Sequence, residues 1–282
     1  MGREQTNYKQ GHSASTVSNH AIRTVETDAS FVLPHIKPTD RILDTGCGPG
    51  SITVGFTRYA TQGSVVGVDL SEAVLDMARE RVDSASTASI SFVAADVLAG
   101  LPFPDNEFDI VFASQLFPHL LGGDKTLRAL REMRRVLKPG GILATRDAAE
   151  IHWYPARLGL DRTMTRRMLR GIGSESWPGG GLPSRVREAG FDVDADGSGP
   201  GVAGRKSRIG LGTTVHFGAE TRARFADGFL GRLEEGDANR KAWADAGMTD
   251  SEVEESRAAL TEWKATEDAW YLGIHTEILV WK

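Results

Sequence analysis

Leu43-Asp44-Thr45-Gly46-Cys47-Gly48-Pro49-Gly50 carries a glycine at every second position, directly after the apolar run Ile42-Leu43. Glycine has no Cβ, so it allows a ligand to approach the backbone closely, and it tolerates positive φ in a tight turn. The next stretch, Ser51 to Tyr59, is typical of a helix whose amino-terminal end faces that ligand. The sequence therefore predicts a strand, a turn and a helix that together hold a small cofactor.

The spacing of the glycines bears on which cofactor is bound. A dinucleotide fingerprint has the form Gly-x-Gly-x-x-Gly, whereas the third glycine of this chain, Gly50, comes one position early. The form Asp-x-Gly-x-Gly-x-Gly resembles the first motif of class I S-adenosylmethionine (SAM) methyltransferases. A structural turn is the competing interpretation of the glycines taken alone.

The organisation of the chain changes at about residues 40 and 150. From residue 41 to about 148, strand-like and helix-like segments alternate, which predicts a doubly wound α/β sheet. The expected strands are Arg41–Thr45, Val65–Asp69, Ile90–Ala94, Phe108–Ala113 and Ile142–Arg146, with a last one at Tyr271–Trp281. We expect a helical cap over residues 1–40, a SAM-binding core over 41–150, and substrate-lid helices plus the final strands of the sheet over 151–282.

The two flanking parts predict further elements. A helix is expected over Ala21–Ile36, before Pro38, and a mobile loop over the glycine-rich stretch Gly197–Gly212. The remaining expected helices are Ala156–Arg170, a short one running into Ala189, Glu220–Leu233, and Ser251–Trp263, the last after the capping box Thr249-Asp250-Ser251-Glu252.

Composition excludes several classes of protein. The 282 residues carry a net charge of −5 and the pI is about 5.8, which is not the electrostatic signature of a nucleic-acid binder. Cys47 is the only cysteine, so no disulfide can form within the chain. No secretion signal or membrane-spanning run is apparent, and no metal site is predicted. We expect a cytoplasmic protein that acts on a small molecule, and the oligomeric state stays open.

Acidic residues follow two further predicted strands. Asp69 could accept both hydroxyl groups of a ribose, and the carboxyl ends of parallel strands meet at one edge of the sheet, close to Gly46 and Gly48. NAD-binding proteins share this acidic position. Asp96 could accept the amino hydrogens of an adenine while the neighbouring backbone N–H addresses a ring nitrogen, although an ordinary loop aspartate is the competing interpretation. Asp96 therefore favours SAM over NAD only in combination with its neighbours.

Five segments, in this order, resemble methyltransferases of the ubiquinone/menaquinone-biosynthesis type: LDTGCGPG, VVGVDLS, AADV, LPFPDNEFDIVFASQLFPHL and LREMRRVLKPGGILATRD. The resemblance implies SAM as cofactor, S-adenosylhomocysteine as product, and a mostly parallel, seven-stranded Rossmann-like sheet. Tyr8–His12, Asn19–Thr24 and Trp270–Lys282 look like a subgroup associated with secondary metabolism. That subgroup includes the fungal enzymes that S-methylate epidithiodiketopiperazine dithiols such as reduced gliotoxin.

The resemblance also implies roles for single residues. Gly46 and Gly48 would line the methionine part of SAM. Asp69 would bind the ribose, and Asp96 with Val97 would bind the adenine. Cys47, within the same motif, is better explained as a small packed side chain than as a nucleophile.

Other residues would surround the reactive end of SAM. Ser114, Gln115 and His119 would flank the sulfonium, and Tyr8 or Arg23 could reach the carboxylate from the cap. An exposed helix arginine is an equal alternative for Arg23. The complete predicted cofactor-binding set is Tyr8, Arg23, Asp44, Gly46, Cys47, Gly48, Asp69, Leu70, Asp96, Val97, Ser114, Gln115 and His119.

The acceptor is the least constrained part of the prediction. Methyl transfer is an in-line displacement, so a dedicated base is optional, and a thiol with a pKa near 8.5 needs the least help. Sulfur is therefore slightly favoured over oxygen, nitrogen or carbon. His119 and His152 are candidate bases, with surface or otherwise satisfied histidines as the competing interpretation. The predicted substrate-binding residues are Trp153, Tyr154, Met168, Trp177 and Phe229, although aromatic residues at such spacings are also common in plain cores.

Two other functions compete with a methyltransferase acting on a small molecule. The first is a SAM-binding enzyme or regulator that transfers no methyl group. The second is an NAD-dependent oxidoreductase, which the glycine spacing and Asp96 oppose.

Overall fold

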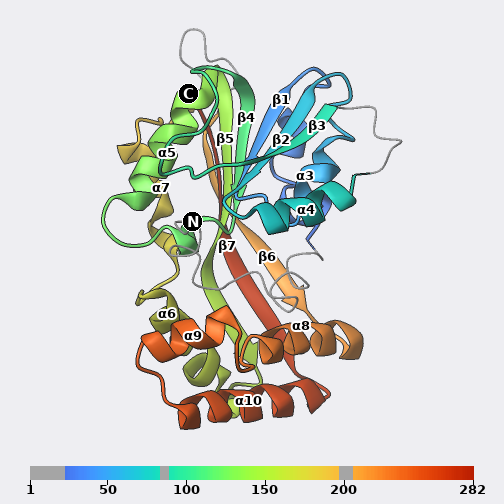
Figure 1. Ribbon diagram of the computed structural model, residues 1–282, viewed down its shortest axis with the longest axis vertical. Coiled ribbons are helices and arrows are strands. Elements are labelled where there is room, and N and C mark those ends of the chain that lie inside the picture. Colours follow the sequence, from blue (N-terminus) through green and yellow to red (C-terminus); the bar gives the residue numbers. More distant parts are fainter. Residues whose placement is uncertain (1–22, 83–88, 197–205) are drawn as a thin grey trace. The chain divides into compact units, whose positions relative to one another are not determined.

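A computed structural model describes residues 23–82, 89–196 and 206–282 (Figure 1). These residues form two compact units. The first contains the described parts of residues 23–147 and 181–212, together with 276–282. The second contains residues 148–180 and 213–275. Tyr8, with the rest of the segment Tyr8–His12, and residues 19–22 of the segment Asn19–Thr24 lie outside the described residues.

Within the described residues, the sheet has seven strands in the order β3-β2-β1-β4-β5-β7-β6. Neighbours from β3 to β5 pair in parallel. The Gly140 N–H donates to Lys282 O (2.8 Å) and the Lys282 N–H donates to Gly141 O (3.0 Å), so the start of β5 lies beside the end of the chain, as in an antiparallel pair. The strands are β1 Arg41–Thr45, β2 Ser64–Asp69, β3 Ser89–Ala94, β4 Phe108–Ser114, β5 Leu137–Tyr154, β6 Arg208–His216 and β7 Trp270–Trp281. The predicted Rossmann-like α/β fold is confirmed, and its sheet is mixed.

Helices occupy the segments between the strands. They are α2 Val25–Asp28, α3 Ser51–Phe56, α4 Glu72–Glu80, α5 Lys125–Val136, α6 Arg166–Ile172, α7 Leu182–Glu188, α8 Ala219–Gly231, α9 Ala238–Asp245 and α10 Asp250–Ala265. Short 3-10 turns include η1 Leu33–His35 and η2 Phe117–His119. Figure 1 shows α5 and α7 on one side of the strands β1–β5, with α3 and α4 on the other.

Alternate residues of the central strands fill two separate cores in the first unit, because successive side chains of a strand point to opposite faces. On one face, Val111 and Leu143 pack with α5 and α7. On the other face, Phe112 and Ala144 pack with α2 and α3, where Phe56 contacts Phe112 edge-to-face at 5.2 Å. Strands buried on both faces explain the apolar runs that identified them in the sequence.

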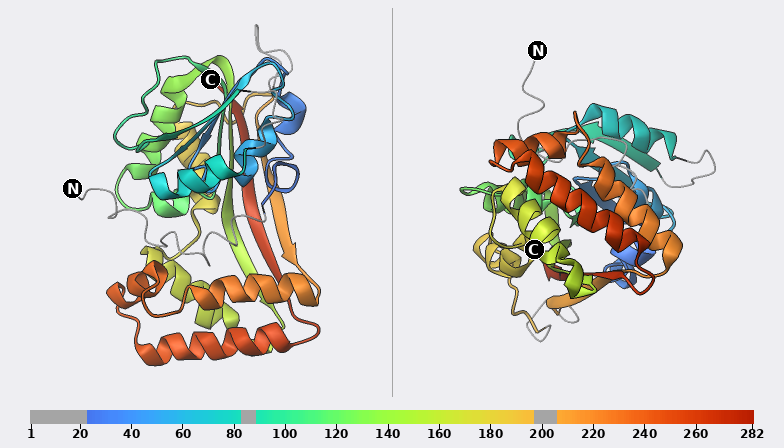
Figure 2. Two further views of the ribbon diagram at one scale, coloured as in Figure 1. Left: turned by 45° about the vertical axis from the view of Figure 1, so that its right-hand side comes forward. Right: turned by 90° about the horizontal axis from the view of Figure 1, so that it is seen from below.

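The second unit has an aromatic core. Trp153 is 2% exposed and lies 5.1 Å from Trp263, ring centroid to ring centroid. Both indole N–H groups are satisfied: Trp153 Nε1 donates to Thr165 Oγ1 (3.0 Å) and Trp263 Nε1 donates to Tyr154 O (2.9 Å). Phe225, Phe229 and Tyr271 complete the cluster around Trp153. Figure 2 shows α8 lying alongside α10 within this unit.

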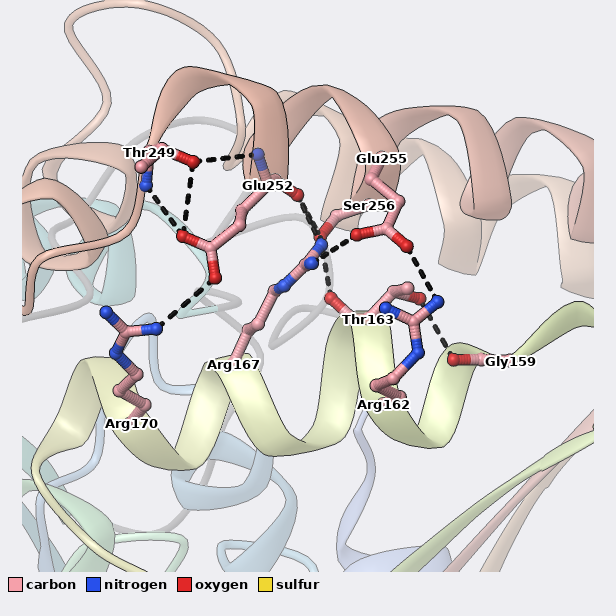
Figure 3. Close-up of polar contacts among 9 residues, drawn as sticks. All are labelled: Gly159, Arg162, Thr163, Arg167, Arg170, Thr249, Glu252, Glu255 and Ser256. Carbon is pink, nitrogen blue, oxygen red and sulfur yellow. Dashed lines mark hydrogen bonds and ion pairs between the residues drawn. The ribbon is translucent and has the colours of Figure 1, made fainter.

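A polar network fastens α6 to α10 in the same unit (Figure 3). Arg167 is 8% exposed, and its guanidinium donates to Ser256 Oγ (2.8 Å), to the Glu252 carbonyl and to Glu255. The predicted capping box is confirmed, since the Glu252 N–H donates to Thr249 Oγ1 (3.2 Å) and the Thr249 N–H to Glu252 Oε2 (2.8 Å).

Several sequence predictions of elements were wrong within the described residues. In place of a helix over Ala21–Ile36, α2 ends at Asp28, Ala29 leaves the helical region at φ −132°, and Pro34 lies in the separate turn η1. The expected helix over Ala156–Arg170 consists of a 3-10 turn, a π-helical segment and the start of α6. α9 was not predicted at all.

The glycine-rich stretch Gly197–Gly212 was also misassigned in part. Residues 197–205 lie outside the described residues, but Arg208–His216 forms β6 rather than a loop. An added Cβ at Gly212 would lie 2.1 Å from Glu277 Oε1, so a larger residue there would displace the Glu277 side chain. A glycine within a strand often marks such a close approach.

Candidate functional site

The glycine turn lies between β1 and α3, and its three glycines adopt left-handed backbone conformations. Gly46, Gly48 and Gly50 have φ values of 75°, 53° and 76°. The N–H groups of Gly46 and Cys47 both donate to Val68 O, at 2.8 and 3.0 Å. The turn is therefore fastened to the end of β2.

The three glycines meet different surroundings. An added Cβ at Gly50 would lie 2.8 Å from Ala78 Cβ in α4, and one at Gly46 would lie 2.8 Å from Leu116 Cδ1. These two glycines allow close packing of the protein with itself. An added Cβ at Gly48 would have no atom within 4 Å among the described residues. Gly48 is thus the open side of the turn.

Asp69 joins the glycine turn to the end of β2. Its Oδ2 accepts the Gly48 N–H at 3.0 Å, and its Oδ1 accepts the Ser71 N–H at 3.1 Å. The side chain is half-buried. Each carboxylate oxygen keeps a lone pair, so the group can accept two further hydrogen bonds, as a ribose diol would donate.

Asp96 and Val97 lie at the end of β3, next to Asp69. The Ala95 N–H donates to Asp69 O at 3.0 Å, and Asp96 Oδ1 accepts the Leu98 N–H at 2.8 Å. Asp96 is half-buried, whereas Val97 is 8% exposed. Asp96 can still accept hydrogen bonds from a ligand, because its other oxygen makes no hydrogen bond to a described residue.

The segment after β4 holds a strained residue. Gln115 has φ 56°, a left-handed conformation that is costly for a residue with a Cβ. Ser114 Oγ and Gln115 Nε2 are enclosed and have no hydrogen-bond partner among the described residues. Buried polar atoms of this kind require an explanation, and strained residues cluster at functional sites. His119 ends the turn η2 and is half-buried.

Two predicted residues of the glycine motif are turned toward the protein. Asp44 is 3% exposed and accepts the Thr53 hydroxyl at 2.6 Å. Burial raises the pKa of Asp44 to about 7, against the lowering effect of the Thr53 hydrogen bond and with a further rise from the Asp69 charge. Burial also raises the pKa of the Cys47 thiol well above its usual range, which agrees with a packed side chain rather than a nucleophile.

The other predicted residues divide between the units. Arg23 and Leu70 are half-buried residues of the first unit. In the second unit, Trp153 and Phe229 lie in the aromatic core, and the exposed Tyr154 stacks on Trp270 at 4.3 Å. Also in that unit are His152 and Met168, which are half-buried, and Trp177, which is buried.

Sequence reasoning missed a charged pair on β5. Arg146 is 1% exposed and pairs with Asp28 of α2 at 2.9 Å and with Glu277 of β7 at 3.5 Å. Asp147 is completely buried, and its Oδ1 accepts the Phe117 N–H at 3.1 Å. The signal was present in the sequence, because two adjacent charges at the end of an apolar strand are uncommon in a core.

Comparison with known proteins gives the family. A family model described as "Methyltransferase domain" matches residues 42–141. The "Probable methyltransferase ltbC" of Aspergillus luteorubrus is 44% identical over 289 residues, covering 99% of this chain and 98% of that protein. The "Ubiquinone/menaquinone biosynthesis C-methyltransferase UbiE" of Vibrio parahaemolyticus is 39% identical over 109 residues, covering 38% of this chain and 40% of that enzyme. The YcgJ protein of Bacillus subtilis shares the fold, with a TM-score of 0.54 at 15% identity over 94% of this chain and 98% of that chain.

The chain belongs to the methyltransferase family. It is a SAM-dependent methyltransferase, and S-adenosylmethionine is its cofactor. The geometry of the first unit fits this cofactor: an open glycine turn, a carboxylate with free lone pairs, and enclosed polar atoms lie at the carboxyl ends of the strands, where ligands bind in such sheets.

Two features are absent from the part of the chain that the structure describes. No helix in that part of the chain has the length and apolarity needed to cross a bilayer. Within the same residues, no group of three or more His, Cys, Asp or Glu side chains is placed to hold a metal ion.

Proposed function

We propose that SAM binds across the glycine turn and the ends of β2, β3 and β4. The observation that carries this proposal is the Asp69 carboxylate, which is bonded to the Gly48 N–H at 3.0 Å and still has acceptor capacity. Gly46 and Gly48 would line the methionine part, Asp69 with Leu70 the ribose, and Asp96 with Val97 the adenine. Ser114, Gln115 and His119 would flank the sulfonium.

Four further predicted residues would act around this set. Asp44 and Cys47 would support the turn from within the protein. Either Arg23, which is described and half-buried, or Tyr8 would reach the SAM carboxylate.

The methyl acceptor is proposed to be a small molecule of secondary metabolism, with sulfur slightly favoured as the acceptor atom. The UbiE relative is by its name a C-methyltransferase of quinone biosynthesis, which supports a small acceptor and makes carbon the main competitor. The net charge of −5 disfavours a polyanionic substrate. Sulfur has the chemical advantage that a thiol ionises near neutral pH without a strong base.

The parts of the chain outside the core are proposed to bind the methyl acceptor. The division into a cap over residues 1–40, a core over 41–150 and a lid with the final strands over 151–282 assigns acceptor binding to the parts outside the core. The proposed contacts are Trp153, Tyr154, Met168, Trp177 and Phe229, with His119 or His152 as an optional base. A cytoplasmic location is also proposed, because no secretion signal or membrane-spanning run is apparent in the sequence.

An acceptor panel tests the proposal. The purified full chain is incubated with SAM and separate sets of dithiols, monothiols, phenols, quinols and amines, and both S-adenosylhomocysteine and methylated product are measured by mass spectrometry. We expect turnover with thiols first. Turnover restricted to quinols would assign carbon or oxygen methylation instead. SAM binding without turnover on any panel would favour a non-methylating enzyme or regulator.

A further inference from the structure

Asp147 has a costly position in the first unit. It follows Arg146, the last residue of β5 that pairs with β4, opposite Ser114. The carboxyl group is 0% exposed, and Oδ1 accepts the Phe117 N–H at 3.1 Å. Oδ2 has no hydrogen-bond partner among the described residues. A buried carboxyl group with one hydrogen bond is expensive, so its presence calls for a compensating role.

The partner of Asp147 belongs to the strained turn after β4. The Gln115 N–H donates to Arg146 O at 2.9 Å, and the Phe117 N–H donates to Asp147. Two consecutive residues of β5 therefore hold a turn in which Gln115 is left-handed at φ 56°. Such a conformation persists only where the surroundings enforce it.

The turn carries a side chain that reaches the glycine motif. Leu116, between the two anchored residues, contacts Gly46 so closely that an added Cβ on the glycine would lie 2.8 Å from Leu116 Cδ1. Movement of the turn would displace Leu116 from Gly46. It would also move Gln115 and His119, which belong to the proposed sulfonium end of the site.

We propose that Asp147 is a positioning residue of the SAM site: through the Phe117 N–H, its carboxyl group holds the turn Gln115–His119 in the conformation that seats Leu116 against Gly46. The inference rests on the proposed SAM site. Asp147 acts through the turn and does not itself contact SAM.

The electrostatic surroundings favour a neutral carboxyl group in this role. Burial raises the pKa of Asp147 well above its usual range, while the Phe117 hydrogen bond and the charges of Arg23 and Arg146 act in the opposite direction. Arg146 is itself paired with Asp28 and Glu277. A neutral carboxyl group can be replaced by an amide of the same shape, whose oxygen also accepts the Phe117 N–H.

The experiment compares Asp147→Asn with Asp147→Leu in the full chain. SAM affinity is measured by calorimetric titration and folding by circular dichroism and thermal melting. Asp147→Asn is expected to keep the dissociation constant within about twofold, because the acceptor for Phe117 remains. Asp147→Leu removes that acceptor at similar volume, and the dissociation constant is expected to rise about tenfold or more.

Asp40 provides the matched control. It is 7% exposed, its Oδ2 accepts the Lys37 N–H at 2.8 Å, and it precedes β1 at the end of the strand away from the glycine turn. Asp40→Leu is expected to lower the melting temperature while leaving SAM affinity unchanged. If Asp147→Leu behaves in the same way, Asp147 is merely structural and the inference is wrong.

Two further outcomes decide the remaining cases. Equal loss of affinity in Asp147→Asn and Asp147→Leu would mean that an acceptor for the Phe117 N–H is not sufficient, which contradicts the inference. If Asp147→Leu does not fold, hydrogen exchange at the Phe117 amide decides: protection in the wild type and in Asp147→Asn is expected, and rapid exchange in the wild type overturns the inference. Asp69→Ala tests the proposed SAM site independently of Asp147. Unchanged SAM affinity in that variant would show that the proposed site is wrong, whatever the result for Asp147.

Discussion

Asp69 is the residue on which the proposed cofactor site depends most. Replacing it with alanine removes the acceptor of the Gly48 and Ser71 N–H groups and the proposed ribose contacts. We expect SAM affinity to fall by about 10- to 100-fold, since hydrogen bonds to a charged group contribute about 1.5–3 kcal/mol. Calorimetric titration measures the effect. Asp76→Ala, an exposed carboxylate on α4, is the control and should bind SAM normally.

Asp44 predicts a pH dependence of stability. The pKa of this carboxyl group rises from 3.8 to about 7 in the folded protein, so the folded state holds a proton that the unfolded state has released. The stabilisation is complete below pH 4 and is lost as the pH rises toward 7, by at most about 1.4 kcal/mol per pH unit. Asp44→Asn keeps an acceptor for the Thr53 hydroxyl and should remove this loss.

Urea unfolding at several pH values between 4 and 8 measures the difference between wild type and Asp44→Asn. The variant should gain stability relative to the wild type as the pH rises across this range. Parallel curves for the two proteins would show that Asp44 is ionised when folded. Other acidic groups are common to both proteins and cancel in the comparison.

At the scale of elements, the contact between α6 and α10 depends on Arg167 (Figure 3). Arg167→Leu leaves Ser256 and the Glu252 carbonyl without this buried donor, and we expect a loss of about 2 kcal/mol in the free energy of unfolding. Arg162→Leu is the matched control, because Arg162 pairs with the same Glu255 from a side chain that is 63% exposed. That change should cost less than about 0.5 kcal/mol. Equal losses of unfolding free energy in the two variants would show that the contact between α6 and α10 does not depend on Arg167.

The sequence predicted the bounds of the first four strands well and those of the later strands less well. β1 to β4 agree with prediction to within a residue. Of these, β1, β2 and β4 are buried along most of their length, and strands buried on both faces give apolar runs. β5 was predicted too short: the expected strand was Ile142–Arg146, yet the strand begins at Leu137 and runs to Tyr154. β6 was missed because Gly210 and Gly212 suggested a loop.

The residues of the candidate site were likewise predicted only in part. Gly46, Gly48 and Asp69 were predicted together, because the ends of parallel strands meet at one edge, and the structure links them. Arg146 and Asp147 were not predicted, since their partners Asp28 and Phe117 are 118 and 30 residues away in the sequence. Their adjacency at the end of an apolar strand marks the two residues as unusual, but it does not identify partners so far away in the sequence.

For the whole molecule, cofactor binding should be visible as increased stability. A ligand at 100 times its dissociation constant adds about 2.7 kcal/mol to the free energy of unfolding. We expect SAM and S-adenosylhomocysteine to raise the melting temperature and NADH to leave it unchanged. At the same ligand concentrations, Asp69→Ala should reduce this stabilisation to about 0.4–1.4 kcal/mol. A shift with NADH alone would contradict the cofactor assignment.

β5 places Arg146 and Asp147 next to each other, and each serves a different face of the sheet. Arg146 pairs with Asp28 of α2, while Asp147 holds the turn after β4. Deleting or inserting one residue earlier in β5 would exchange the two faces, because side chains alternate along a strand. Both contacts would be lost in a single step. In evolutionary terms, a substitution at either position disturbs one contact, whereas a change in the length of the strand disturbs both, so insertions are expected in the loops.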